Sequence, residues 1–170
     1  GADQATWKRA LDAFRSGKDR GPQQTSAPKR RGGQPMVEVI PHALKPFHVH
    51  AYRLAEDLIC YVGGNATANE ALWRYGEGEQ LWLHVKGLPG SHVLVPTPQA
   101  RVPQEALLDA ARLAVSHSPA KEGTKIPVDY TQVRYVKKPP GTPPGYVTYT
   151  RERTLLVDPY NDQELKRRKL

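Results

Sequence analysis

Residues 80–95 constrain the fold of this chain more than any other segment, because their pattern predicts a β-hairpin. Aliphatic residues at 81, 83 and 85 alternate with Trp82, His84 and Lys86, and this period of two is typical of a strand with two different faces. Residues 87–90 read Gly-Leu-Pro-Gly, which favours a chain reversal. Residues 92–95 can then return as the second strand, so the segment predicts a hairpin with one apolar and one polar face.

The polar face of this hairpin combines side chains that suit a nucleic acid. Trp82, His84 and Lys86 leave the first strand on the same side, and Ser91 and His92 follow the turn. An aromatic ring, two imidazoles, an ammonium group and a hydroxyl can together hold RNA or another phosphorylated ligand. Two interpretations of Trp82 stay open: it stacks on a nucleobase, or it packs in the core beneath the sheet.

The positive charge of the chain lies at its two ends and in one downstream stretch. The 170 residues carry a formal net charge of +8. Residues 1–35 hold eight Lys/Arg against three Asp, and residues 161–170 hold four against two acids. Between them, the stretch 121–153 holds seven Lys/Arg against three acids. A local basic stripe is expected of a phosphate-contacting protein, and we predict that Arg134, Lys137 and Lys138 make such contacts.

We predict that the hairpin and the strand carrying these three basic residues form one composite RNA-binding surface. Both segments place polar side chains on one face of a strand, which a core alone does not need. Neighbouring strands lie about 4.8 Å apart, so a few strands can unite the two segments. If Lys137 and Lys138 are exposed, replacing both by alanine leaves the melting temperature nearly unchanged.

The remaining pattern predicts a single α+β domain with a mostly antiparallel sheet and two to three packed helices. Residues 1–16 read as the end of a helix, as expected after a preceding coiled coil, and 17–35 as a flexible basic linker. The domain is expected over 36–160, followed by a basic tail at 161–170. Asn65 or Thr67 can cap the first helix, which is expected to run through Tyr75, and Thr67-x-x-Glu70 has the form of a capping box. The other predicted helices cover 103–117 and 162–168, and the other predicted strands cover 37–40, 47–54, 58–62, 126–130, 133–138, 145–150 and 154–157.

Neither metal binding nor catalysis has a matching motif in the chain. His48, His50, His84 and His92 suit zinc chemically, but no Cys pair or HExxH helix accompanies them, so we predict no metal and no cofactor. A nuclease built on His84, His92 and Asp129 is chemically possible. The chain has no nucleophile elbow, P-loop or paired-carboxylate spacing, however, and Asp129 is expected to serve the structure. We therefore predict a binding module rather than an enzyme.

The composition predicts a cytoplasmic protein without a membrane span. No run of 18 or more apolar residues is present. The first residues lack the basic and apolar regions of a signal peptide. The one cysteine, Cys60, lies in an apolar run and is expected to be buried.

Several sequence blocks between about residues 45 and 160 keep a recognisable order and spacing. They are Val62-Gly-Gly-Asn65, Asn69-Glu-Ala-Leu72, Trp82-Leu-His84, Pro89-Gly-Ser-His-Val93, Ala110-Ala-Arg-Leu-Ala114, Val128-Asp-Tyr-Thr131, Val136-Lys-Lys-Pro139 and Pro144-Gly-Tyr-Val-Thr-Tyr149. Together they resemble the NFACT-R domain, the RNA-binding module of the NFACT proteins, which include RqcH and NEMF. Gly64, Gln80 and Pro143 depart from the residues usual in that family.

This resemblance implies a role in ribosome-associated quality control. RqcH-like proteins bind the large ribosomal subunit that carries a stalled chain and recruit tRNA, so that a C-terminal tail, alanine in bacteria, is added without mRNA. The implied partners are tRNA, the rRNA of the large subunit and the other domains of a full-length NFACT protein. Peptide-bond chemistry would belong to the ribosome. Two alternatives stay open: a surface adhesin, as the older label "fibronectin-binding protein" suggests, and a stand-alone RNA-processing enzyme.

Overall fold

A computed structural model describes residues 39–170 of the chain. The predicted helix at 1–16 and linker at 17–35 lie outside these residues. The main sheet has six strands, paired antiparallel in the order β1-β2-β4-β3-β5-β8. Its strands are β1 (Val49–Arg53), β2 (Ile59–Gly63), β3 (Gln80–Val85), β4 (Val93–Pro98), β5 (Ile126–Gln132) and β8 (Arg153–Val157). A small second sheet pairs β6 (Val136–Lys137) with β7 (Thr148–Tyr149).

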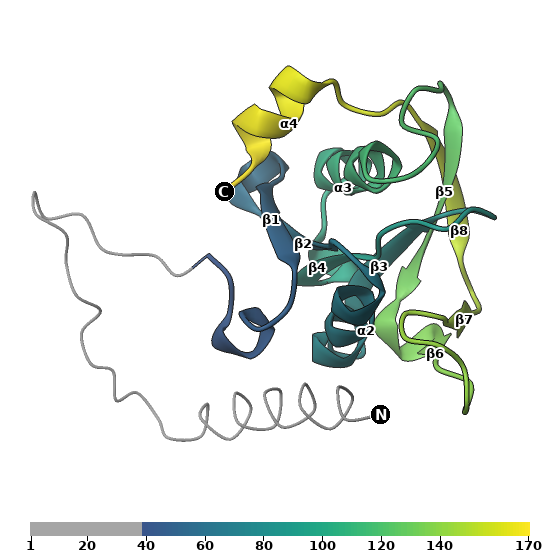
Figure 1. Ribbon diagram of the computed structural model, residues 1–170. Coiled ribbons are helices and arrows are strands. Elements are labelled where there is room, and N and C mark those ends of the chain that lie inside the picture. Colours follow the sequence, from purple (N-terminus) through teal and green to yellow (C-terminus); the bar gives the residue numbers. More distant parts are fainter. Residues whose placement is uncertain (1–38) are drawn as a thin grey trace, which may run out of the picture.

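Helices cover both faces of the main sheet (Figure 1). On one face, the small residues of α3 (Gln104–Ser116) pack against the aliphatic side chains at 81, 83 and 85, and α4 (Asp162–Arg168) lies beyond α3. On the other face, α2 (Ala66–Tyr75) packs against Trp82 and Leu94. Both faces of the strands are therefore buried, which confirms the α+β fold with a mostly antiparallel sheet and three packed helices.

The predicted hairpin is present as β3 and β4. The two strands pair with Trp82 opposite Leu94 and Leu83 opposite Val93, and an irregularity follows Gln80. The chain leaves this hairpin through η3 (Gln99–Arg101) and enters α3, as the sequence predicts. The buried position of Cys60 is also confirmed.

Three of the predicted strands are wrong in part. Of the strand predicted at 145–150, only residues 148–149 pair, as β7, and residues 145–147 lie in a loop. Residues 39 and 40 form a bend before η1 (His42–Leu44), and they pack on the α2 side of the core without joining a ladder. Residues 133–135 form the 3₁₀ turn η4 (Val133–Tyr135), where the Arg134 N–H donates to the Gly78 carbonyl at 3.0 Å. This turn takes the chain off the main sheet, so that only residues 136–137 pair with β7.

Of the two caps predicted for α2, Asn65 is confirmed and the Thr67-x-x-Glu70 capping box is wrong. The Asn65 side chain caps the helix and accepts from the Ala68 N–H at 2.9 Å. Glu70 does not reach back to the helix start, because its carboxylate is buried against the Gly145 N–H, at 3.1 Å. The 3₁₀ turn η2 (Ala55–Asp57) joins β1 to β2, as predicted. Within residues 39–170, no helix has the length and apolar character needed to span a bilayer.

Candidate nucleic-acid interface

A cleft of about 820 Å³ opens where the hairpin turn meets the loop after Pro143. Its walls come from the turn at 87–92, the loop at 143–147 and the start of α2 at 64–66. Its floor includes Trp82, His84 and Tyr149. Four of the predicted RNA-contact residues line this cleft, namely Trp82, His84, Ser91 and His92.

Trp82 is the buried floor of the cleft and not an exposed platform. Its side chain has 0% exposure, and three rings surround it: His84 parallel at 5.9 Å, His92 edge-to-face at 5.1 Å and Tyr149 at 4.9 Å. A fully covered indole has no face to offer to a base. The prediction that Trp82 stacks on RNA is therefore wrong for this conformation, and its core interpretation holds.

His92 is equally buried, and burial keeps its ring neutral. Only 2% of this residue is exposed, and burial, together with nearby His84, lowers its pKa from 6.5 to about 3. Its Nε2 atom lies 3.1 Å from the Gly145 carbonyl oxygen, which is an acceptor, so Nε2 carries the proton. Burial also lowers the pKa of half-buried His84. At neutral pH the two imidazoles therefore add no positive charge, and His92 makes no direct contact with a phosphate.

The fold should lose stability in acid because of His92. The unfolded ring titrates near 6.5 and the folded ring near 3, so the unfolded state binds more protons throughout this interval. The contribution of His92 to stability is complete above pH 6.5 and falls by about 1.4 kcal/mol for each pH unit from there down to about pH 3, while His117, with its pKa lowered to about 4, adds a loss that both proteins share. Urea unfolding of the wild type and of His92→Gln between pH 7 and pH 5 measures this, and the variant should show the shallower dependence. If the free energy of unfolding depends equally on pH in the two proteins, groups other than His92 cause the acid sensitivity.

Hydrogen bonds to α2 and β2 hold the turn in place. The Ser91 hydroxyl donates to the Gly63 carbonyl at 2.5 Å, and the Asn69 carboxamide oxygen accepts from the His92 N–H at 2.9 Å. A Cβ atom on Gly63 would come within 2.1 Å of the Asn69 oxygen, so only glycine allows this approach. The Ser91 hydroxyl proton is already donated to the Gly63 carbonyl oxygen. The hydroxyl therefore cannot also donate to a phosphate, in contrast to its predicted role in RNA binding.

Lys138 is a structural residue and not a free cation. Its ammonium group lies 3.0 Å from the Glu70 carboxylate, and the two side chains are only 11% and 4% exposed. The same ammonium donates to the carbonyls of Thr142, at 3.0 Å, and Pro143. The predicted phosphate contact by Lys138 is therefore wrong, because its ammonium group already binds Glu70 and the loop that forms one wall of the cleft.

The other predicted cations lie around the cleft and not in it. Lys86 is half-exposed and lies 3.3 Å from buried Asp129, which also accepts from Tyr149 and Thr154. Arg134 and Lys137 are exposed. Lys137 pairs with residue 148, beside the cleft wall. Arg134 lies beside the start of β3, and Lys86 follows the end of that strand. The length of the strand separates the two residues by about 20 Å.

A guanidinium–aromatic cluster adds to the basic character near Arg134. The guanidiniums of Arg134 and Arg151 lie 5.2 and 5.3 Å from the ring centre of Tyr135. Sequence reasoning did not include Arg151, which is far from Arg134 along the chain and joins it only through the fold.

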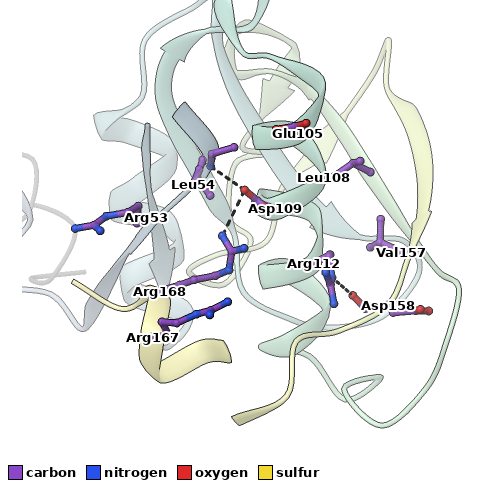
Figure 2. A pocket seen from close by; sticks show the side chains of 11 residues that line it. Arg53, Leu54, Glu105, Leu108, Asp109, Arg112, Val157, Asp158, Arg167 and Arg168 are labelled. Atoms are coloured by element: carbon purple, nitrogen blue, oxygen red, sulfur yellow. Dashed lines mark hydrogen bonds and ion pairs between the residues drawn. The ribbon is translucent and has the colours of Figure 1, made fainter. Parts of the chain in front are cut away.

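A second cleft, of about 750 Å³, lies on the α3 side of the sheet and serves the structure (Figure 2). Asp109 in its centre accepts from the Ala55 N–H at 2.8 Å and the Tyr160 hydroxyl at 2.7 Å, and it pairs with Arg168 at 3.4 Å. Arg112 donates to the carbonyl oxygen of Asp158 at 3.0 Å. These groups attach α4 to α3, and none of the predicted RNA-contact residues lines this cleft.

Among residues 39–170, no three His, Cys, Asp or Glu side chains are grouped so as to hold a metal ion. His48, His50 and His117 do meet, with ring centres 4.8 Å apart for the first pair and 5.9 Å for the second. The His117 Nε2 atom is hydrogen-bonded to the Tyr52 hydroxyl at 2.8 Å. Burial lowers the pKa of His117 to about 4.

The model of the family described as "NFACT protein RNA binding domain" matches residues 48–150, which contain the whole cleft. The chain belongs to the NFACT-R family. This NFACT-R domain is 37% identical over 143 residues to a protein named Rqc2 homolog RqcH from Bacillus subtilis, covering 84% of the chain and 24% of that relative. An RqcH of Streptococcus pneumoniae is 41% identical over 103 residues, covering 59% of the chain and 18% of the relative. The chain therefore spans a quarter or less of these relatives.

A solved structure, the C-terminal part of the fibronectin/fibrinogen-binding protein from Streptococcus suis, has the same fold as this NFACT-R domain. The TM-score is 0.66 at 30% identity, covering 84% of this chain and 55% of that one. The coiled-coil domain-containing protein 25 homolog of Dictyostelium discoideum is 31% identical over 103 residues, covering 57% of the chain and 50% of the relative.

Sequence reasoning missed the loop at 143–147 as part of the site. Its Pro144-Gly-Tyr sequence contributed to the family resemblance, but we assigned no role to Tyr146. The signal was present, because Tyr146 directly follows the turn-forming Pro144-Gly145 pair, although we expected a strand at 145–150. The exposure of this side chain, 53%, shows that it does not.

Proposed function

We propose that this NFACT-R domain binds RNA on the face that carries the cleft, as part of a ribosome quality control protein similar to RqcH. The observation that supports this best is the convergence of three of the sequence blocks that carry the family resemblance. The blocks beginning at Val62, Pro89 and Pro144, which are far apart in the chain, all contribute to the walls of one cleft. The proposed RNA partners are tRNA and the rRNA of the large subunit, and the proposed role is to position RNA during C-terminal tailing.

The charges around the cleft suit an RNA backbone. The floor is neutral, Lys86 directly precedes the hairpin turn, Lys137 pairs with residue 148, and Arg134 and Arg151 contact Tyr135. Cations at the edge of such a site hold phosphates, and the neutral floor remains for sugar and base. The domain acts in this account as a binding module that works in a cytoplasmic protein, with the chemistry left to the ribosome.

Removing three of these cations should weaken RNA binding and its salt dependence. We expect the triple variant Lys86→Gln, Arg134→Gln, Lys137→Gln to reduce the slope of log affinity against log salt by about 2, since each phosphate contact to a single strand contributes about 0.7. Arg134 and Lys137 are exposed and should be replaceable at little cost, whereas Lys86 pairs with buried Asp129 at 3.3 Å, so its replacement should lower the melting temperature, and binding is measured well below that temperature. Fluorescence anisotropy with a single-stranded RNA at several salt concentrations measures the slope.

A matched control for that experiment removes three exposed cations elsewhere, Arg101→Gln, Lys121→Gln and Lys166→Gln. It has the same net charge as the first variant. If both variants lower the affinity equally, net charge alone attracts RNA and the cleft face is not the site.

A separate assay tests the alternative of a stand-alone RNA-processing enzyme. RNA that stays intact after incubation with the purified protein, with and without divalent metal, would argue against that alternative.

A further inference from the structure

A buried nitrogen atom of a cleft residue, Trp82 Nε1, lacks a hydrogen-bond partner within residues 39–170. The indole nitrogen can only donate. An unpaired buried donor destabilises a protein, so such atoms are uncommon without a reason. The floor of the cleft thus presents one donor that an acceptor atom of a ligand would satisfy.

Apolar side chains at the edge of the same cleft stand in solvent. Tyr146 is 53% and Leu88 40% exposed, and these two account for half of the exposed large hydrophobic residues in the described part of the chain. Gly145 places Tyr146 there. Its φ of +83° favours glycine, and an added Cβ would come within 3.0 Å of the Ala66 carbonyl oxygen. The loop is therefore pressed against the start of α2, with the Tyr146 ring at the mouth of the cleft.

We propose that the cleft takes an unpaired nucleobase of single-stranded RNA, stacked against Tyr146, with an acceptor on its polar edge toward the Trp82 indole N–H. This inference rests on the proposed RNA-binding function and names the part of the RNA that enters the cleft. A base combines flat apolar faces that suit Tyr146 and Leu88 with hydrogen-bond acceptors on its edge, one of which can accept from the Trp82 indole N–H. The volume of about 820 Å³ is in the range of sites for small molecules. In a duplex the bases are paired and stacked, so a duplex can engage only the surrounding cations.

The test compares a single-stranded and a duplex RNA of equal length at one salt concentration, using the full chain. Tyr146→Ala should weaken single-strand binding roughly 5- to 100-fold and leave duplex binding within about twofold, as expected for the loss of one stacked base. Tyr146→Phe keeps the ring and should bind like the wild type. Leu156→Ala removes an exposed side chain that is 65% accessible and lies outside the cleft, and serves as the matched control.

Nuclear magnetic resonance adds a direct observation of the floor. The chain has three tryptophans, and Trp73 Nε1 already donates to the Val136 carbonyl at 3.0 Å. Saturation with single-stranded RNA should move the Trp82 indole N–H signal and leave that of Trp73 in place, with the signals assigned from Trp7→Phe and Trp73→Phe.

Equal effects of Tyr146→Ala on both RNA forms, or no effect on either, would overturn the nucleobase site, as would an unmoved Trp82 signal at saturation. The cation variant Lys86→Gln, Arg134→Gln, Lys137→Gln separates this failure from that of the proposed function. If it weakens both RNA forms while Tyr146→Ala weakens neither, RNA binding at this face stands and only the base site is lost. If neither variant changes binding, both proposals fail.

Discussion

Replacing Lys138 with alanine is expected to lower the free energy of unfolding by about 3–5 kcal/mol, the loss typical of a buried ion pair that loses one partner. The Glu70 carboxylate would remain almost fully covered without its counter-charge, which lies 3.0 Å away in the wild type. The carbonyls of residues 142 and 143 would lose a donor at the same time. Urea unfolding at pH 7 measures the loss.

The neighbouring Lys137 provides the matched control. It has the same chemistry and is exposed, with no ion pair within the described residues, so Lys137→Ala should change the free energy of unfolding by less than about 0.5 kcal/mol. We had expected both lysines to be replaceable without cost, and the structure corrects this for Lys138. Similar losses for the two variants would show that the Glu70–Lys138 pair does not hold the loop.

Trp82→Ala is expected to cost about 3–5 kcal/mol, because it removes a large, fully buried side chain and leaves a cavity among three packed rings. Thermal and urea unfolding measure the loss, and Trp82→Phe should recover part of it. The contrast with Tyr146→Ala is the informative result, since that exposed residue should affect RNA binding with little change in stability. A stable Trp82→Ala variant would contradict the assignment of Trp82 to the core.

The elements that could be predicted from the sequence are those whose side chains follow a simple period. The hairpin alternates, α3 repeats small apolar residues on one face, and the range predicted for the last helix is the observed α4. The failures occurred where a tertiary contact outweighs the local pattern. Residues 133–135 have strand-like composition, yet they turn because the Arg134 N–H finds its acceptor in the loop before β3.

The site was harder to predict, because charge and aromatic character in a sequence do not report burial. Lys137 and Lys138 are adjacent and identical in type, yet one faces solvent and the other pairs with Glu70, a residue on α2. Trp82 lies on the polar face of β3, and only the packing of α2 and β7 on that face reveals that it is covered. The predicted hairpin turn lies in one wall of the cleft, while the opposite wall, with Tyr146, required the fold.

The central claim is that RNA lies on the cleft face of this domain, and ultraviolet crosslinking of the full-length protein in cells tests it most directly. Mass spectrometry of the adducts identifies the protein segments, and sequencing identifies the RNA. We expect nucleotide adducts on peptides containing residues 86–92 and 143–149, bearing tRNA or large-subunit rRNA, and fewer of them in the Lys86→Gln, Arg134→Gln, Lys137→Gln variant. Adducts confined to α3 and α4, or an absence of both RNA classes, would contradict the account.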